Sequence, residues 1–248
     1  ELVQLYAGFS QGASVQLPVM ALQYADYAAW QRGWMDAGEQ QRQLNYWREL
    51  LGGEQPVLEL PLDHPRPAVQ SYRGALLEIG LDSGVVAGLK ALAQREGVTL
   101  FMLLLASFQT LLHRYSGQAQ VRVGVPVANR NRFETERLLG FFVNTQVLQA
   151  DVHGQMPFDQ LLAQVKQRAL EAQAHQDLPF EQLVQVLQPE RSLSHNPLFQ
   201  VMFNHQDSLR SAPVQLPGLA LQPVDWAGHS TQFDLNLETE ESADGLWA

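Results

Sequence analysis

The stretch between residues 72 and 128 limits the possible folds most, because its hydrophobic periodicity changes type in a defined order. Alternation predicts a strand from Tyr72 to Leu81, and apolar residues at helical spacing predict an amphipathic helix from Val85 to Gln94. A strongly apolar helix follows, with Thr99 as its N-cap and Gly117 near its end. A buried strand from Val121 to Ala128 closes the series, so we expect mixed α/β layers.

The remaining segments predict further helices and strands, bounded by proline, glycine or small polar residues. Pro157 is expected to open a helix that runs to Gln173. Asp177 is expected to cap the next helix, which has Pro179 in its first turn and carries Phe180, Leu183, Val184 and Leu187. The other expected elements are helices at residues 1–9, 20–34 and 39–51, strands at 138–148, 198–203, 233–240 and 246–248, and a long loop at 208–232 with a short strand at 219–221.

A proline-rich segment at residues 61–67 is the best linker in the chain. Its three prolines exclude a helix and an interior strand, so we place a domain boundary between residues 1–67 and 68–248. The first nine residues have helix periodicity without a cap, and the return strand that begins at Leu246 stops at Ala248. We therefore expect a fragment that is truncated at both ends.

The charge and cysteine content exclude several classes of function. A formal charge of −10 without a Lys/Arg cluster argues against nucleic-acid binding and against an anionic membrane surface. The absence of cysteine excludes disulfides, thiolate metal sites and a cysteine nucleophile. The longest apolar run, residues 100–106, is far shorter than the roughly 20 residues that a membrane span needs. No signal peptide is recognisable, so the cytoplasm is the expected location.

Residues 138–146, LLGFFVNTQ, form the strongest candidate site in the sequence. Gly140 allows a close approach of the backbone, and the three apolar residues after it are expected to exclude water. Asn144 can donate and accept hydrogen bonds, and Thr145 and Gln146 add further polar groups. The alternative interpretation is an ordinary buried strand that starts at a glycine and ends in a polar turn.

Two other patterns have a structural explanation as well as a functional one. Ser10 lies in a G-x-S-x-G sequence, but a helix precedes it where a nucleophile elbow needs a strand, so we interpret it as a helix end. Asp26 lies among aromatic residues at helical spacing that include Tyr24, Trp30 and Trp34. We interpret these residues as a core stripe, unless Asp26 itself is buried.

The histidines and Arg130 have both structural and functional interpretations. None of the seven histidines has a second histidine or an acidic residue at metal-binding spacing, so no metal site is expected. His205 and Asp207 are interpreted as the solvated end of a strand, not as a catalytic dyad. Arg130 follows Asn129 at the end of a buried strand, where a guanidinium either finds a carboxylate or carbonyl partner or stays at the surface.

Four stretches, in this order and spacing, resemble signature motifs of the condensation domains of nonribosomal peptide synthetases. They are YADYAAW (Tyr24–Trp30), LGFFVNTQ (Leu139–Gln146), HQDLPFE (His175–Glu181) and RSLSHNPLF (Arg191–Phe199). Together they extend over nearly the whole chain. The connecting segments ELPLDHPRP and GVPVANR also resemble that family.

The resemblance implies an α/β fold, a pair of chloramphenicol-acetyltransferase-like two-layer sandwiches arranged as a V. Residues 1–67 would be the end of the N-terminal subdomain and the crossover linker, and residues 68–248 a nearly complete C-terminal subdomain. Phosphopantetheine arms of upstream and downstream carrier domains would enter a tunnel between the subdomains, with an adenylation domain adjacent. No directly bound cofactor is implied.

The resemblance also implies roles for individual residues. Arg130 resembles the arginine that pairs with an aspartate across the subdomain cleft, and Asn144 and Thr145 resemble residues beside the acyl-transfer centre. Asn129, Gly140, Phe142 and Gln146 complete the implied tunnel set. The residues implied to be structural parts of the motifs are Tyr24, Asp26, Trp30, His175, Asp177, Pro179, Arg191, Asn196 and Pro197.

The family's catalytic signature, HHxxxDG, is missing from this sequence, and with it the general-base histidine and structural aspartate. The resemblance implies amide formation between a carrier-bound acyl donor and a carrier-bound aminoacyl acceptor, and the fragment alone is expected to be inactive. Three alternatives stay open: a non-catalytic piece that docks carrier proteins, an epimerisation-type relative, and a hydrolase using Ser10. The sequence GFFVNT argues against epimerisation, because epimerisation domains resemble it poorly.

Overall fold

A mixed β-sheet organises the molecule. The computed structural model describes residues 1–187, 192–206, 216, 218–219, 230–242 and 245–248. Within these residues the strand order is β1-β6-β5-β4-β2-β3, and β4 lies parallel to both β2 and β5. The strands are β1 (Gly80–Asp82), β2 (Gln120–Val127), β3 (Asn144–Asp151), β4 (Val201–Gln206), β5 (Leu235–Ser242) and β6 (Gly245–Trp247).

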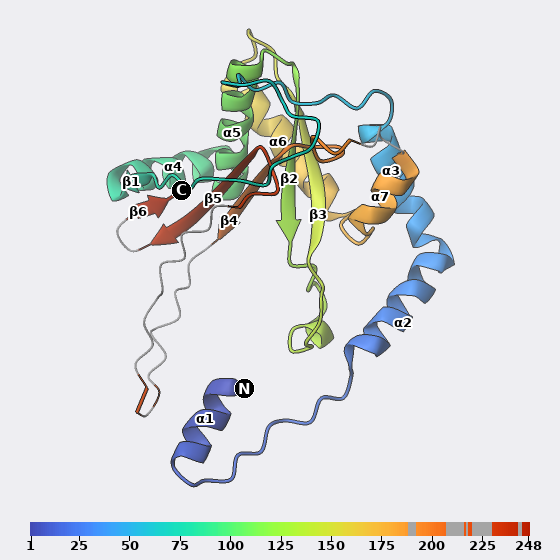
Figure 1. Ribbon diagram of the computed structural model, residues 1–248, viewed down its shortest axis with the longest axis vertical. Coiled ribbons are helices and arrows are strands. Elements are labelled where there is room, and N and C mark those ends of the chain that lie inside the picture. Colours follow the sequence, from blue (N-terminus) through green and yellow to red (C-terminus); the bar gives the residue numbers. More distant parts are fainter. Residues whose placement is uncertain (188–191, 207–215, 217, 220–229, 243–244) are drawn as a thin grey trace.

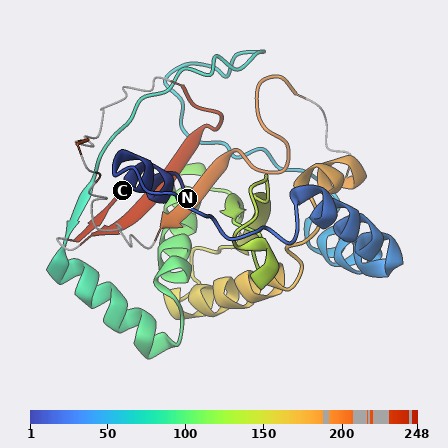
Figure 2. The same ribbon diagram turned by 90° about the horizontal axis from the view of Figure 1, so that it is seen from below.

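Three helices cover one face of this sheet, and two more lie beside its β3 edge (Figures 1 and 2). The covering helices are α4 (Ser83–Glu96), α5 (Leu100–Ser116) and α6 (Phe158–Gln173), and the edge helices are α3 (Gln40–Leu51) and α7 (Phe180–Leu187). The two-layer α/β fold is therefore confirmed. The main core contains Leu103, Leu105, Leu112, Val121, Val123, Val147, Leu162 and Phe203, all almost completely buried.

Local capping explains where the covering helices begin and end. The Asp82 carboxylate accepts from the backbone N–H groups of Gly84 and Val85, so α4 starts slightly earlier than its apolar pattern suggests. Thr99 caps α5 as predicted, because its hydroxyl oxygen accepts from the Met102 N–H. Gly117 then ends α5 in the left-handed region, at a φ of 72°.

The N-terminal helices lie away from the sheet (Figure 1). They are α1 (Leu2–Ser10) and α2 (Tyr24–Trp34), and α2 continues through the π-helical turn Met35–Glu39 into α3. No residue of α1 or α2 is buried. In contrast, Leu44, Trp47 and Leu51 of α3 join the main core. The domain boundary after residue 67 stays a prediction.

Two strand predictions were wrong in their extent. Only Gly80 and Leu81 of the predicted 72–81 strand belong to β1, and Leu76 and Leu77 are 82% and 77% exposed. The alternating pattern predicted an extended segment but could not show whether a neighbouring strand is available to pair with it, and a strand is stable only when it is paired. The strand predicted at 138–148 begins only at Asn144, because residues 138–143 form part of a loop between β2 and β3. This segment, residues 128–143 with the short helix Phe133–Thr135, is called the 128–143 loop below.

Smaller shifts affect other predicted elements. Helix α2 begins at Tyr24, later than predicted, and β4 begins at Val201 after a buried Leu198 with a φ of 65°. Of the strand predicted at 219–221, Leu219 forms an isolated bridge with Leu216, and residues 220–221 lie outside the described residues, as does most of the loop predicted at 208–232.

No single described helix is long and apolar enough to cross a membrane. The pair α4 and α5, bent by 102°, meets that test by length and composition. The apolar residues of α5 pack in the main core.

Candidate functional site

The first contact of the site joins α2 to the 128–143 loop. The Tyr24 hydroxyl donates to the Phe141 carbonyl at 2.6 Å, across 117 positions of sequence. The Tyr24 ring packs directly on Gly140, where an added Cβ would lie 2.1 Å from ring atom Cδ2. The close approach predicted for Gly140 therefore has a partner, and only glycine fits beneath this ring.

Phe142 is the buried centre of an aromatic cluster. Its ring centroid lies 5.1 Å from Tyr24, in an edge-on arrangement, and 4.7 Å from Tyr27. The Arg130 guanidinium lies 4.2 Å from the same centroid and donates to two backbone carbonyls of the 128–143 loop. Of the two possibilities left open for Arg130, the structure has the paired one, with carbonyl partners within this chain. Phe141, in contrast, is 77% exposed, so the water-excluding role expected of the whole apolar run applies only to Phe142.

The aromatic stripe of α2 is not a buried core, contrary to our interpretation of the sequence. Trp30 is 38% exposed, stacks on Trp34 at 5.1 Å, and lies beneath the Arg132 guanidinium at 4.1 Å. Asp26 is exposed and accepts from the Gln23 N–H as part of a capping box. The side chains of α2 therefore cover the 128–143 loop instead of the sheet.

Asn144 is bonded through both ends of its amide to the 174–179 segment and to the first residue of α7. Its Nδ2 donates to the carbonyls of Gln176 and Leu178 at 2.9 and 2.8 Å, and its Oδ1 accepts from the Phe180 N–H at 3.0 Å. Both donor hydrogens are thus engaged within the chain. Asn144 fixes the 174–179 loop, which joins α6 to α7, on the first residue of β3.

Helix α3 fixes the other side of the 174–179 loop. Gln43 is fully buried, and its Oε1 accepts from the Leu178 N–H at 2.8 Å. The Trp47 indole N–H donates to the carbonyl of His175 at 2.9 Å. His175 Nδ1 faces the Glu171 carbonyl, which can only accept, and Nε2 faces an Arg42 N–H donor. In this arrangement Nδ1 is the donor of the ring and Nε2 is its acceptor.

The N-cap role predicted for Asp177 was wrong. Its carboxylate accepts from the side-chain amides of Gln43 at 3.2 Å and Asn131 at 3.4 Å, while Asn144 takes the first N–H of α7. A tertiary acceptor has replaced the local one. Burial raises the pKa of the Tyr27 hydroxyl above its ordinary value, and the nearby Asp177 carboxylate raises it further.

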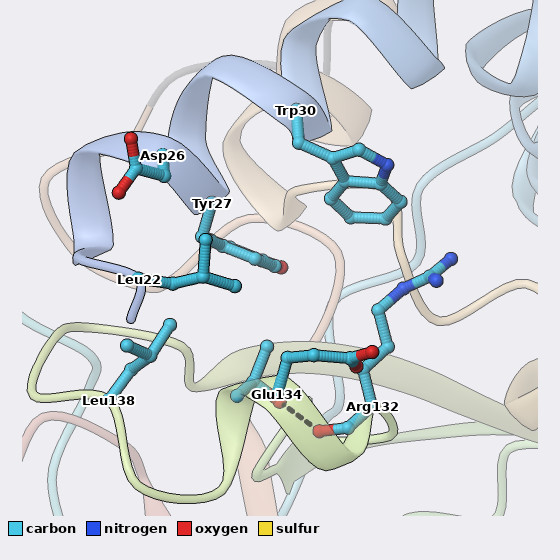
Figure 3. A pocket seen from close by; sticks show the side chains of 8 residues that line it. Leu22, Asp26, Tyr27, Trp30, Arg132, Glu134 and Leu138 are labelled. Carbon is cyan, nitrogen blue, oxygen red and sulfur yellow. Dashed lines mark hydrogen bonds between the residues drawn. The ribbon is translucent and has the colours of Figure 1, made fainter. Parts of the chain in front are cut away.

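These side chains surround a hollow of about 160 Å³, which we call the amide hollow. It is lined by three of the implied tunnel residues (Asn129, Phe142 and Asn144) and by three residues implied to be structural parts of the motifs (Tyr24, Asp177 and Pro179). The other lining residues are Tyr27, Gln31, Phe141, Val143 and Glu181. A neighbouring hollow of about 290 Å³ lies between α2 and the 128–143 loop, and Tyr27 lines both (Figure 3). Asn129 is only 8% exposed, has a φ of 53°, and its Oδ1 has no hydrogen-bond partner within the described part of the chain.

Other predicted site residues lie elsewhere. The buried Gln146 donates to the carbonyl of Ala172 at 2.6 Å and therefore points toward α6, while Thr145 pairs with Pro126 in the sheet. Gly140 and Arg130 adjoin the amide hollow without lining it, and His175 lies behind it against α3.

The fourth resembling stretch is remote from the amide hollow. Asn196 donates to the Gln232 carbonyl at 2.5 Å, and Pro197 accepts from the Phe199 N–H. Arg66 in the proline-rich linker forms a two-bond ion pair with Asp234, which raises the pKa of the arginine. This stretch holds the linker against the start of β5. Arg191 lies outside the described residues.

The interpretation of His205 as the solvated end of a strand was wrong. The His205 side chain is only 6% exposed, and its Nδ1 lies 2.9 Å from the Thr239 hydroxyl, so it is not a solvated strand end. Asp207 lies outside the described residues. Among the described residues, no group of three or more His, Asp or Glu side chains could hold a metal ion.

Sequence reasoning missed Tyr27, Gln31, Gln43 and Glu181. Tyr27 had a detectable signal, because it follows Tyr24 by three residues and so shares its helix face. Gln43 had none. Its role depends on a contact with Leu178, 135 positions away.

Comparison with known proteins identifies the family. The profile of the family described as "Condensation domain" matches residues 1–247, and the chain belongs to this family. One of the linear gramicidin synthase proteins from Brevibacillus parabrevis is 52% identical over 250 residues, which are 100% of this chain and 3% of that protein. Tyrocidine synthase 3 from the same organism is 42% identical over 99% of the chain and 4% of its own length. The chain thus spans only a few per cent of these curated relatives.

Solved structures agree with the fold. The X-domain from teicoplanin biosynthesis has a TM-score of 0.87 and 27% identity, over 99% of this chain and 57% of its own. A four-domain nonribosomal peptide synthetase bound to AMP and glycine has a TM-score of 0.75 and 31% identity, over 83% of this chain and 17% of its own. The condensation domain from the polyketide synthase MokA has a TM-score of 0.79 and 23% identity, over 97% of this chain and 57% of its own, which supports the fold alone.

Proposed function

We propose that this chain is part of a condensation domain that forms an amide between a carrier-bound acyl thioester and a carrier-bound amine in nonribosomal peptide synthesis. The observation that carries the proposal is the convergence of three family-like stretches, from α2, the 128–143 loop with β3, and the 174–179 loop, on one small hollow. Membership of the condensation family over residues 1–247 supports the same reaction class.

The chemistry is compatible with few polar groups. Aminolysis of a thioester needs the amine and carbonyl held close together, with water excluded. Such positioning can supply roughly 7–11 kcal/mol of barrier reduction, whereas acid–base help of 10²–10⁴-fold supplies about 3–5 kcal/mol. A rigid loop is therefore worth more than an additional titratable side chain, and Asn144 and Gln43 provide that rigidity.

We assign the chain a positioning role and leave the proton transfer to residues outside it. The sequence has no HHxxxDG, the signature that the family resemblance implies as the source of the general base. Arg130 would pair with the aspartate of that signature in the intact domain. Its present contacts, two carbonyls and the Phe142 ring, hold the guanidinium in place, which supports this proposal.

The proposed partners follow from the proposed reaction. Carrier domains on both sides would present the donor and the acceptor on phosphopantetheine arms, and an adenylation domain would load them. The likeness to a four-domain synthetase at 31% identity supports this multidomain context. We propose a cytoplasmic location for such an assembly.

The proposal is tested in the intact parent protein by loading both carriers and measuring the amide product on the acceptor carrier by mass spectrometry. Arg130→Ala is expected to abolish product, whereas Arg137→Ala, an exposed arginine of the same loop, is expected to leave it unchanged. Wild-type turnover with Arg130→Ala would remove the ion-pair role. Unfolding curves of both variants distinguish loss of activity from loss of folding.

A second candidate is a binding module without catalysis. The observation that favours it is the TM-score of 0.86 to the teicoplanin X-domain, solved as a complex with OxyB, at 27% identity. Under this proposal the parent protein would bind a partner enzyme and form no amide in the same assay.

A further inference from the structure

A break in the helical backbone separates α2 from α3. Within the π-helical turn Met35–Glu39, Gly38 has a φ of 117° and a ψ of −11°, which lie outside the helical range. We propose that α2 is a lid that rotates about Gly38 and thereby opens the amide hollow and the neighbouring hollow together. The opening is independent of the proposed function, and only its use for substrate entry rests on that function.

Gly38 has the properties of a hinge residue. A φ of 117° is a conformation that glycine adopts readily and that residues with a Cβ rarely adopt. Among the described residues, no atom of a neighbouring segment lies within 4 Å of the position that a Cβ would take, so space is available for the backbone to rotate. Turns of the π-helical type are frequent at functional sites, and hinges consist of a few residues that absorb a change in backbone angles.

Helix α3 is the fixed arm of this hinge. Trp47 and Leu51 belong to the main core, and the buried Gln43 accepts from the Leu178 N–H at 2.8 Å. Met35 is also buried, but it lies in the turn itself and moves little when α2 rotates. A change in the angle between the two helices therefore displaces α2.

Helix α2 is the moving arm, because only contacts near the surface hold it. None of its residues is buried. Within the described part of the chain, its side chains form a single hydrogen bond to another element, from the Tyr24 hydroxyl to the Phe141 carbonyl. Its aromatic rings also contact Phe142 and Arg132. Opening would break these contacts and expose the Phe142 ring while the main core stays intact, so an open minor state is expected.

The two hollows lie where this lid closes on the 128–143 loop. They measure about 290 and 160 Å³, and Tyr27 lines both. Across the larger hollow, Tyr27 and Trp30 of α2 face Arg132 and Leu138 of the loop (Figure 3). Pockets for small ligands usually have about 300–1,000 Å³, so the amide hollow alone is too small to hold a carrier-bound substrate in the closed state. Withdrawing Tyr27 would join the two hollows and enlarge the space.

The test measures the opening by the reactivity of a buried thiol. The sequence contains no cysteine, so a single introduced thiol reports one position. Thr135 lines the larger hollow, is 3% exposed, and has nearly the size of cysteine. Phe133, in the same loop, is 83% exposed. We expect Thr135→Cys to react with dithiobis(nitrobenzoate) about 10–1,000-fold more slowly than Phe133→Cys, because a minor state is populated at about 0.1–10%.

The hinge itself is tested by adding Gly38→Ala to Thr135→Cys. Alanine at a positive φ strains the closed state, and this cost corresponds to about a tenfold change in the open population. We therefore expect the thiol to react about tenfold faster. Gly33→Ala, at a glycine of α2 with open space around it, is the matched control and is expected to leave the rate unchanged.

Three kinds of result would overturn the inference. The first is equal reactivity at positions 135 and 133, which would show that no closed state exists, or no reaction at all of folded Thr135→Cys, which would show that no open state exists. The second is a rate that Gly38→Ala leaves unchanged or that Gly33→Ala raises equally. The third is a rate that rises steeply with urea below the unfolding transition, because opening of α2 alone exposes little surface and global unfolding exposes much.

The thiol assay involves no amide formation. Failure of this inference is therefore distinguishable from failure of the proposed function.

Discussion

Replacing Asn144 by leucine tests whether this residue acts mainly by fixing the 174–179 loop. The change removes three hydrogen bonds at once, two donated to the carbonyls of Gln176 and Leu178 and one accepted from the Phe180 N–H. Leucine has a similar volume but no polar atoms. The three backbone groups lose their partners, and each of them has to find water or stay unpaired.

The size of the effect follows from the burial of those groups. Leu178 is 3% exposed, so its unpaired carbonyl costs about 1–3 kcal/mol, while the half-buried Gln176 and Phe180 groups cost about 0.5–1 kcal/mol each. We therefore expect Asn144→Leu to lower the free energy of unfolding by about 2–5 kcal/mol. The total free energy of unfolding of a globular protein is about 5–15 kcal/mol, so this loss is a large part of it.

Urea denaturation followed by tryptophan fluorescence measures this difference. Asn45→Leu is the matched control, because Asn45 is exposed on α3 and bonds only the exposed Gln41 side chain, and it is expected to stay within about 0.5 kcal/mol of wild type. If the Asn144→Leu variant were as stable as the control, Asn144 would not be fixing the 174–179 loop. If that variant also lost condensation in the parent protein, Asn144 would be a substrate-binding residue instead.

Three further predictions concern other contacts. Gly140→Ala is expected to lower the free energy of unfolding by about 1–3 kcal/mol, because the new Cβ collides with the Tyr24 ring. Gly33→Ala, in helix α2 with open space around it, is expected to raise it by about 0.5–1 kcal/mol. A double-mutant cycle on Arg66 and Asp234 should give a coupling free energy of about 1 kcal/mol that falls with added salt. A value near zero would contradict the role of this ion pair in holding the linker against the start of β5. The hydrogen bond from Arg42 is the main cause that lowers the pKa of Glu39 below its ordinary value of 4.5. The ionised carboxylate therefore contributes to folding stability above pH 4.5, and this contribution is lost as the pH falls through the lowered pKa. Glu39→Gln should therefore be less stable than wild type at neutral pH and converge with it in acid, and parallel curves would contradict this.

Elements with a complete local signal could be predicted from the sequence. Helix α5 combines apolar periodicity, the Thr99 cap and Gly117, and the structure has it as expected. Strand β2 is an apolar run of the right length, and it lies inside the sheet between β4 and β3. Their boundaries depend on interactions within a few residues, which a sequence pattern contains.

The errors occur where a distant residue decides. Residues 72–79 alternate like a strand, but no neighbouring strand pairs with most of them, and so Leu76 and Leu77 stay exposed. Phe142 belongs to an apolar run that suggests a strand, yet it packs on Tyr24 and Tyr27 of α2. Asp177 has the position of an N-cap, but Asn144 reaches that helix start from β3. Such competition between local and tertiary partners is not encoded in spacing.

The sequence indicated several of the residues that surround the hollow, but not how they contact one another. Tyr24, Asn129, Asn144 and Asp177 were named from the resemblance, and they do lie around one hollow. The contacts that unite them, such as the Tyr24 hydroxyl on the 128–143 loop, could not be read from spacing. Their catalytic and binding roles stay predictions.

The proposed amide-bond formation can be measured directly in the parent protein. The measurement loads the two carrier domains of the parent protein with an acyl thioester and an aminoacyl thioester, and then identifies the species on the acceptor carrier by mass spectrometry. We predict an acyl-aminoacyl product whose formation is lost with Arg130→Ala and retained with Arg137→Ala. Unchanged acyl and aminoacyl thioesters on the two carriers of a folded wild-type protein would contradict the proposed function.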